Sequence, residues 1–211
     1  GNLIMSRGNK LPFERGKSAY QNSTVTSTDL AHLEGQVVYL SHTSPSDTKA
    51  RLSNADVTAI IARNSSSGVL NAGNVVVWKT GKVGTQVDVT SGADQVPAGI
   101  VDDHIPTGGV QVNDLFYLIV KGPVTATFKG GGATHASSKI YDGYPLRVSA
   151  TAGHVEAADE TATGSTELVQ LAHSKVFAGE GGSAGTALAS LSADVSSNPG
   201  KVKVIVNSYP A

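Results

Sequence analysis

The chain has 211 residues, contains no cysteine and carries a formal net charge of -1 at pH 7 from 16 basic and 17 acidic residues. The absence of cysteine excludes disulfides, cysteine-rich zinc sites and thiol catalysis, and the balanced charge provides no field that would draw the protein onto nucleic acid or an anionic membrane. No apolar run reaches the length of about 20 residues that spans a bilayer, and the first residues lack the pattern of an export signal. We therefore expect neither a nucleic-acid partner nor a membrane location.

The composition favours strands and turns over helices. Charged residues make up only 16 % of the chain, below the typical value of about 25 %, and the sequence contains 24 glycines. Glycine supplies the positive φ angles of tight turns, while valine and threonine are stiff at χ1 and fit a pleated sheet. Runs of helix-forming residues at a 3.6-residue period are missing over most of the sequence. These features predict an all-β protein.

Residues 1–33 differ from the rest of the chain. They are rich in basic and small polar residues and show too little hydrophobic periodicity to build a core. The sequence therefore predicts an extended N-terminal arm over residues 1–33 and a single domain over residues 34–211, with a frayed terminus as the alternative for the first segment. The residues that mark the predicted arm are four basic side chains and one aromatic anchor: Arg7, Lys10, Phe13, Arg15 and Lys17.

Three short apolar segments follow, each bounded by turn-forming residues. They cover residues 36–40, 57–62 and 74–79, and their valine, isoleucine and aromatic content predicts strands. Between the first two, Ser44-Pro45-Ser46-Asp47 supplies a proline and a polar cap, which predict one short helix over residues 48–52.

The centre of the chain holds the strongest hydrophobic run. Residues 110–120 are apolar at almost every position, which indicates a strand buried on both faces. Gly122-Pro123 interrupts the run, and residues 124–128 then alternate as a half-buried strand does. We expect two strands joined as a hairpin at Gly122-Pro123.

The remaining strands are short and separated by glycine and proline. They are predicted at residues 139–141, 146–149, 154–156, 168–177 and 201–207, and residues 178–200 are predicted to form a long surface loop. In the last strand Val202 and Val204 are expected to face the core, with Lys201 and Lys203 on the solvent-exposed face. Turn signals about every 8 to 12 residues are typical of a β-barrel or a jelly-roll-like sandwich.

The most enzyme-like cluster is Asp102-Asp103-His104, whose oxygen and imidazole groups suit a divalent metal or acid-base catalysis. Neighbours on a strand point to opposite faces, and Pro106 and Gly108 place the three in a turn, where aspartate is common without any catalytic role. His154 and Glu156 are two residues apart and would share one face of a strand, where a solvated cross-strand surface is the simpler explanation.

Residues 179–186 are glycine-rich and contain the spacing Gly181-x-Ser183-x-Gly185. The segment lacks the strand-to-helix context of a nucleophile elbow and the lysine of a phosphate-binding loop, so a plain loop is favoured. Because each candidate site fails on spacing or context, we expect no enzymatic activity, no metal and no cofactor.

Residues 95–207 resemble the capsid cement or head decoration proteins of tailed bacteriophages. The resemblance is carried by the order and the residue types of four segments: Pro97-Ala98-Gly99-Ile100-Val101, residues 113–126, residues 143–155 and the closing strand from Lys201 to Val206. Asn113 stands where the family often has glycine before an aspartate, here Asp114.

The resemblance implies a β-barrel-like virion protein, made in the host cytoplasm, that decorates the outer surface of the capsid. It further implies a homo-oligomer, with a trimer favoured, that bridges subunits of the major capsid protein and stabilises the shell. In this hypothesis the capsid-contact residues of the arm are Arg7, Lys10, Phe13, Arg15 and Lys17, and the basic residues among them reach onto an acidic neighbouring surface.

A second hypothesis keeps the fold and changes the partner. A surface-exposed fibre or carbohydrate-binding module would use the glycine-rich loops at residues 130–135 and 179–186. A third, an enzyme that uses Asp102, Asp103 and His104, requires convergent partners that the sequence does not supply.

Overall fold

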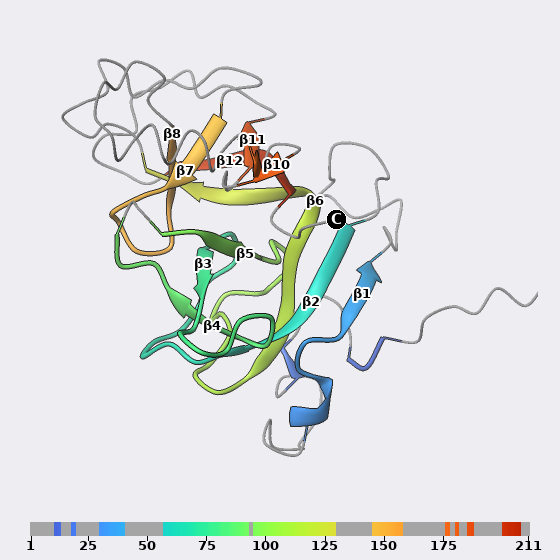
Figure 1. Cartoon of the computed structure of the whole chain (residues 1–211). Helices are drawn as coiled ribbons and strands as arrows, with labels where there is room; N and C mark the ends of the chain where they lie inside the picture. The colour runs from blue at the N-terminus through green and yellow to red at the C-terminus, as the bar shows by residue number, and fades with distance from the viewer. Residues whose placement is uncertain are drawn as a thin grey trace, which may run out of the picture.

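The protein is all-β in a computed structural model of the chain (Figure 1). The structure describes residues 11–13, 18–19, 30–40, 57–92, 95–129, 145–157, 176–177, 180–181, 185–187 and 200–207. Within them twelve strands and one 3-10 turn, η1 (Ala31–Leu33), are formed, which confirms the predicted fold class. In this part of the chain no helix has the length and hydropathy to cross a bilayer.

The strands are short, with one exception. They are β1 (Val37–Leu40), β2 (Val57–Asn64), β3 (Val75–Trp78), β4 (Gln86–Val89), β5 (Pro97–Val101), β6 (Leu115–Phe128), β7 (Pro145–Val148), β8 (Val155–Ala157), β9 (Val176–Phe177), β10 (Glu180–Gly181), β11 (Gly185–Ala187) and β12 (Gly200–Asn207). The exception is β6, which has 14 residues.

Five strands close into a barrel. The pairing runs from β2 to β4, β3, β5 and β6 and then returns to β2, parallel between β2 and β4 and antiparallel at the other four contacts. Of the two architectures that the sequence left open, the structure therefore has the barrel. β1 extends this sheet by pairing antiparallel with β2.

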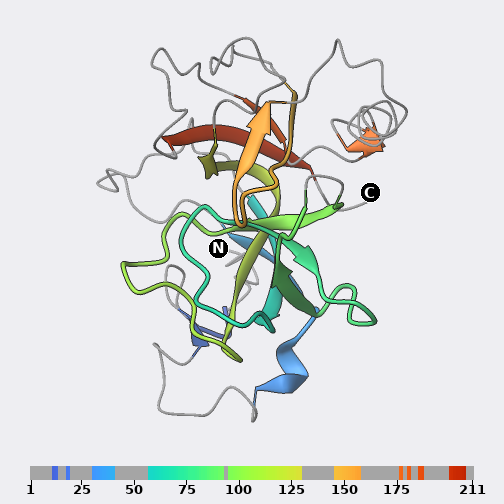
Figure 2. The same cartoon turned by 90° about the vertical axis from the view of Figure 1, so that its left-hand side faces the viewer.

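The same sheet closes a second time. The C-terminal half of β6 pairs with β12, and the pairing continues through β11, β7 and β8 back to β6, where Phe128 meets Val155. Figures 1 and 2 show this second ring on one end of the first barrel. Strand β6 thus belongs to both rings.

The hairpin predicted at Gly122-Pro123 is wrong, because β6 runs through both residues. Gly122 has a φ of 108°, which only glycine adopts easily, and the strand bends here without reversing. The bend falls where β6 changes partners, since Lys121 lies opposite Thr58 of β2 and the residues after it pair with β12. The glycine and proline therefore redirect one strand from the first ring to the second.

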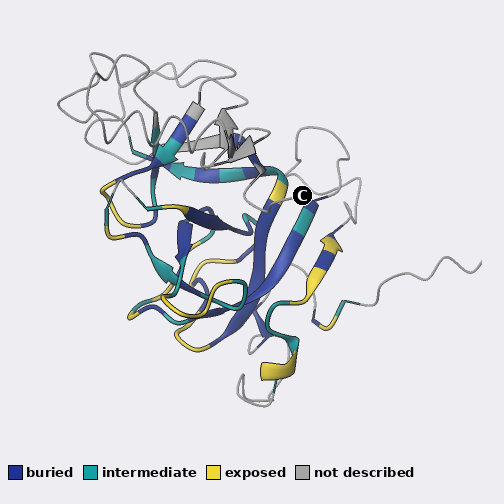
Figure 3. Cartoon of the chain, viewed as in Figure 1, coloured by how far each residue is buried: buried dark blue, intermediate teal, exposed yellow. Residues whose placement is uncertain are grey.

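Two hydrophobic clusters occupy the two faces of β2 and β6, which are buried along most of their length (Figure 3). All five barrel strands contribute to the cluster that holds Phe116, Leu118 and Val120 of β6, so this cluster fills the barrel. The alternate residues of β6, Leu115, Tyr117 and Ile119, belong to the other cluster, which continues into the second ring. The period-two alternation of a strand thus serves two cores.

Two glycines connect the rings where the backbones approach closely. Gly73, with a φ of 85°, accepts a hydrogen bond of 2.8 Å from the backbone N–H of Thr127. Gly153, between β7 and β8, donates to Thr90 Oγ1 at 2.8 Å and accepts from the backbone N–H of Val75 at 3.0 Å. The angle between the two rings is therefore held by backbone contacts at both sites.

Strands β1, β2, β3, β7, β8 and β12 confirm predicted segments, and Val204 is buried as expected. Strands β4 and β5 were not predicted, because β4 carries Asp88 and β5 contains Pro97 and Gly99, which weaken the strand signal. The predicted loop over residues 178–200 is wrong in part, since β10 and β11 form within it. The helix at 48–52 and the strand at 139–141 lie outside the described residues.

Substitution of Gly73 by alanine tests the contact between the rings. An added Cβ would lie 2.7 Å from the carbonyl oxygen of Thr125, whereas at Gly81, whose φ of 72° is similar, nothing lies within 4 Å. We expect Gly73→Ala to lower the free energy of unfolding by about 3 kcal/mol and Gly81→Ala by about 1 kcal/mol, measured by urea unfolding. Equal losses would show that the close approach at Gly73 is unimportant.

Candidate functional site

The N-terminal segment is attached to the outer face of β6 by one aromatic pair. The rings of Phe13 and Tyr117 stack with centroids 4.3 Å apart and planes inclined by 18°. The Tyr117 hydroxyl donates a hydrogen bond of 2.7 Å to the Phe13 carbonyl oxygen and accepts one of 3.4 Å from the Phe13 N–H. We call this arrangement the Phe13–Tyr117 clamp.

The clamp follows from the alternation of β6. Tyr117 lies on the face of β6 that does not line the barrel, so its ring needs a cover and its hydroxyl needs a partner. Leu11, Leu30 and Leu33 pack against the same cluster, and Ala19 is buried in it. The described parts of the N-terminal segment thus complete the core outside the barrel.

Burial changes the chemistry of the clamp. Desolvation raises the pKa of Tyr117 to about 12, and the hydrogen bond with the Phe13 backbone opposes part of the rise. The phenol is therefore neutral at physiological pH and acts as a hydrogen-bond donor.

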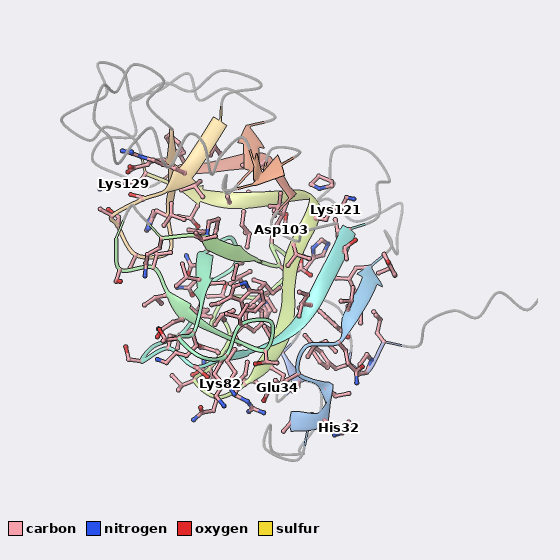
Figure 4. The ribbon with its side chains drawn as sticks, in the orientation of Figure 1. His32, Glu34, Lys82, Asp103, Lys121 and Lys129 are labelled. Atoms are coloured by element: carbon pink, nitrogen blue, oxygen red, sulfur yellow. The ribbon has the colours of Figure 1, made fainter. Side chains whose placement is uncertain are left out.

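A largely buried ion pair lies just before β1. Arg63 Nε lies 2.5 Å from Glu34 Oε1, and Arg63 Nη1 donates to the carbonyl oxygen of Asn113 at 2.6 Å. Gln86 Nε2 donates to the second Glu34 oxygen at 3.2 Å. Figure 4 shows Glu34 at the end of the barrel opposite Asp103 and Lys121. These bonds hold β1 against β2.

Strand β1 presents one apolar face outward. Val38 and Leu40 are buried, while Val37 is 40 % and Tyr39 is 66 % exposed. Among the described strands β1 pairs with β2, so its other edge has no strand partner in that part of the chain.

The structure brings the predicted trio Asp102, Asp103 and His104 together in the turn after β5. His104 Nδ1 lies 3.2 Å from Asp102 Oδ1 and 3.0 Å from Asp103 Oδ1, and one potential ligand atom from each residue lies within 4.8 Å of the others. Asp103 Oδ2 also accepts the backbone N–H of Thr125 at 3.1 Å. This bond ties the turn to β6 just beyond its bend.

The structure gives His154 and Glu156 separate partners. Glu156 forms an ion pair of 2.8 Å with Arg147, its cross-strand neighbour on β7, and His154 Nδ1 lies 2.7 Å from the carbonyl oxygen of Ala152. The Glu156 pair crosses neighbouring strands, but the two side chains are only 12 % and 14 % exposed, so the expected solvated surface is wrong for Glu156.

Of the five residues predicted to mark the arm, Phe13 alone lies within the described residues, and the structure places it inside its own chain, 4 % exposed. The others lie outside that part: Arg7, Lys10, Arg15 and Lys17. The loop at residues 130–135 also lies outside it, and within residues 179–186 the structure describes only the β10 and β11 portions. The sequence did not single out Tyr117, although a tyrosine inside a fully buried run needs a hydroxyl partner.

Comparison with known proteins finds no matching family model and no matching curated protein. Among solved structures, the chain is similar to a chain in the capsid of Myoviridae Phage XM1, at 20 % sequence identity and a TM-score of 0.32. The match covers 59 % of this chain and 79 % of that chain. At this identity and TM-score the similarity assigns neither a family nor a function.

Alkaline unfolding tests the environment of Tyr117. A free phenol ionises near pH 10, so below that pH Tyr117 is neutral in the folded and the unfolded chain and its contribution to stability is complete. Between pH 10 and about 12 the unfolded chain loses the proton first, and stability falls as the pH rises. In urea unfolding across this range we expect wild type to lose roughly 2 kcal/mol more than Tyr117→Phe. The exposed Tyr39→Phe variant should follow wild type, and identical slopes for wild type and Tyr117→Phe would contradict the shifted pKa.

Replacement of Asp103 tests the role of the trio. The Asp103 side chain is 9 % exposed and holds Thr125, whereas Asp88 forms a more exposed pair with Lys79. We expect Asp103→Ala to lower the free energy of unfolding by about 2 kcal/mol and Asp88→Ala by less than about 1 kcal/mol, measured with a chelator present. A loss for Asp103→Ala that requires added Zn²⁺ would contradict a purely structural role.

Proposed function

We propose that this chain is a structural protein of a tailed-bacteriophage virion that decorates the outer surface of the capsid and bridges subunits of the major capsid protein. It acts as a homotrimer, stabilises the shell and has no enzymatic activity. The basic residues near its N-terminus contact an acidic surface of the neighbouring capsid protein.

The first support is where the resembling residues lie in the fold. The segments that resemble capsid cement proteins form β5, β6, β7, β12 and the start of β8. They therefore build the shared strand and much of the second ring. The sequence resemblance coincides with an architectural unit and is not scattered over loops.

The observation that carries the proposal is the Phe13–Tyr117 clamp. It joins a segment rich in basic residues to the barrel at a buried point, three residues after Lys10 and two before Arg15. A segment whose sequence carries basic residues on both sides of a point fixed on the barrel is suited to electrostatic contact with another protein. The polar residues that resemble catalytic groups support the absence of enzymatic activity in this proposal. Asp103 holds the backbone of β6, and Glu156 pairs with Arg147 on the neighbouring strand, so both have structural roles.

Binding to empty shells of the encoding phage, purified without this protein, tests the proposal. Deletion of residues 1–10 removes Arg7 and Lys10 and leaves Phe13 in place, whereas a deletion of residues 1–20 would also remove buried core residues. We expect the shorter deletion, combined with Arg15→Glu, to weaken shell binding at least about tenfold with an unchanged midpoint of thermal unfolding. Lys82→Glu, on the exposed turn between β3 and β4, matches the charge change of Arg15→Glu and should bind as wild type does.

Failure of the wild-type protein to bind these shells, or to raise the temperature at which they rupture, would overturn the proposed function. A monomer in light scattering at the binding concentration would overturn the trimer.

A further inference from the structure

We infer that the outer edge of β1 binds an extended, uncharged segment of a capsid protein, which joins the sheet as an additional strand. The choice of a capsid protein as the partner rests on the proposed function, whereas the capacity of the edge to accept a strand is a property of the fold alone. The residues that would receive the segment are Val37 and Tyr39.

Among the residues that the structure describes, β1 is the one strand of the ten-stranded sheet with a neighbour on one side only. Both rings close, so every other strand of this sheet pairs with strands on both of its sides. The free edge of a sheet carries unpaired N–H and C=O groups and is a template for another strand. The double closure therefore leaves a single such template in the described sheet, and it lies on β1.

The backbone groups of Val37 and Tyr39 point away from β2. The N–H of Ile61 donates to the carbonyl oxygen of Gln36 at 2.9 Å, and in the antiparallel register Val37 lies opposite Ile60. Since hydrogen-bonded pairs alternate along an antiparallel ladder, Val38 and Leu40 bond to β2 and the two residues between and before them do not. No described residue provides a partner for these outward N–H and C=O groups.

Strand β1 lacks the usual protection of an edge strand. Natural edges are protected by charged side chains, proline or a β-bulge, yet β1 reads Val-Val-Tyr-Leu and pairs with β2 without a shift of register. Exposed and buried residues alternate along it, and the exposed ones are Val37 and Tyr39 (Figure 3). A charged residue placed beside them would lose water and find no counter-ion on β1, so the edge favours an uncharged segment.

The edge is already held in place without a partner. Val38 and Leu40 are buried in the cluster that covers the outer face of β6, and Glu34, just before the strand, pairs with Arg63 of β2. Binding at such an edge therefore orders few groups of this chain, which lowers the entropic cost of association.

The small size of the edge favours an extended segment over a second folded copy. A standard interface between two folded proteins uses about 20 to 30 residues a side, whereas β1 has four residues. Strand addition gains its affinity from main-chain hydrogen bonds, and alternate side chains supply the specificity. An edge of four residues thus adds to binding when the partner is also held at a second site, as it is in the proposed bridging of capsid subunits.

Amide hydrogen exchange, resolved to single residues, tests the inference on the full chain, free and bound to the same empty shells. In the free protein we expect the N–H groups of Val37 and Tyr39 to exchange faster than those of Val38 and Leu40, which are bonded to β2. Shell binding should slow exchange at Val37 and Tyr39 at least about tenfold and leave Val38 and Leu40 unchanged.

Three results would overturn the inference. Slow exchange at Val37 and Tyr39 in the free protein that becomes slower with protein concentration would assign the edge to a second copy. Slow exchange at every concentration would assign it to another part of the same chain. Shell binding that leaves both amides exchanging freely would show that the edge stays open in the complex.

Two variants test the contribution of the edge to binding. Val37→Pro removes one outward N–H and no bond to β2, and Tyr39→Lys places a charge beside the incoming strand. We expect shell binding to weaken about fivefold and at least about tenfold, respectively, with unchanged midpoints of thermal unfolding. Val83→Lys, at a 73 % exposed position between β3 and β4, adds the same charge and should bind as wild type does.

Should Val37→Pro fail to fold, Tyr39→Lys and its control carry the test. Wild-type affinity in the folded variants would overturn strand addition and leave the proposed function intact. Absence of shell binding by wild type would overturn the proposed function and with it the capsid partner. The exchange rates of the free protein would then still report whether the edge of β1 is open.

Discussion

The structure depends on the burial of β6 on both faces. A strand with apolar side chains on both sides needs two separate covers, and here the barrel interior supplies one. The other comes from the N-terminal segment, β1 and the second ring, which share one hydrophobic cluster. The clamp, the second ring and the edge position of β1 all follow from this requirement. Removing any of these covers would leave part of the outer face of β6 in contact with water.

The polar groups have structural roles that follow from the same geometry. Arg63 and Glu34 are largely buried at one end of the barrel and satisfy each other together with Asn113 and Gln86. Asp103 holds the backbone of β6 just after its bend at the other end. Charged side chains are costly to bury and are stable only when hydrogen bonds satisfy them, which both sites provide.

Local sequence patterns predicted the strands better than their connections. The alternation in residues 124–128 and the continuous apolar run before it were sufficient to predict the two halves of β6 as strands, because side-chain direction depends only on the strand itself. The double closure of the sheet was not predictable, since the pairings of β6 with β2 and β12 join residues far apart in the chain. Gly122-Pro123 was mistaken for a turn because these residues favour turns and strand bends alike. Phe13 was predicted to contact a partner, because the site above Tyr117 that receives its ring exists only in the folded sheet and leaves no local sequence signal.

Because β6 belongs to both rings, it also determines the order in which the two rings can form during synthesis. The second half of β6 finds its long partner in β12, which is synthesised only after the chain has passed through β7, β8 and β11. During translation the first barrel can therefore close while the outer half of its longest strand still lacks a neighbour on that side. Non-local pairing of this kind is slow and exposes strand edges to other chains. Until β12 arrives, the C-terminal half of β6 therefore offers an unpaired edge on which another chain could form a strand.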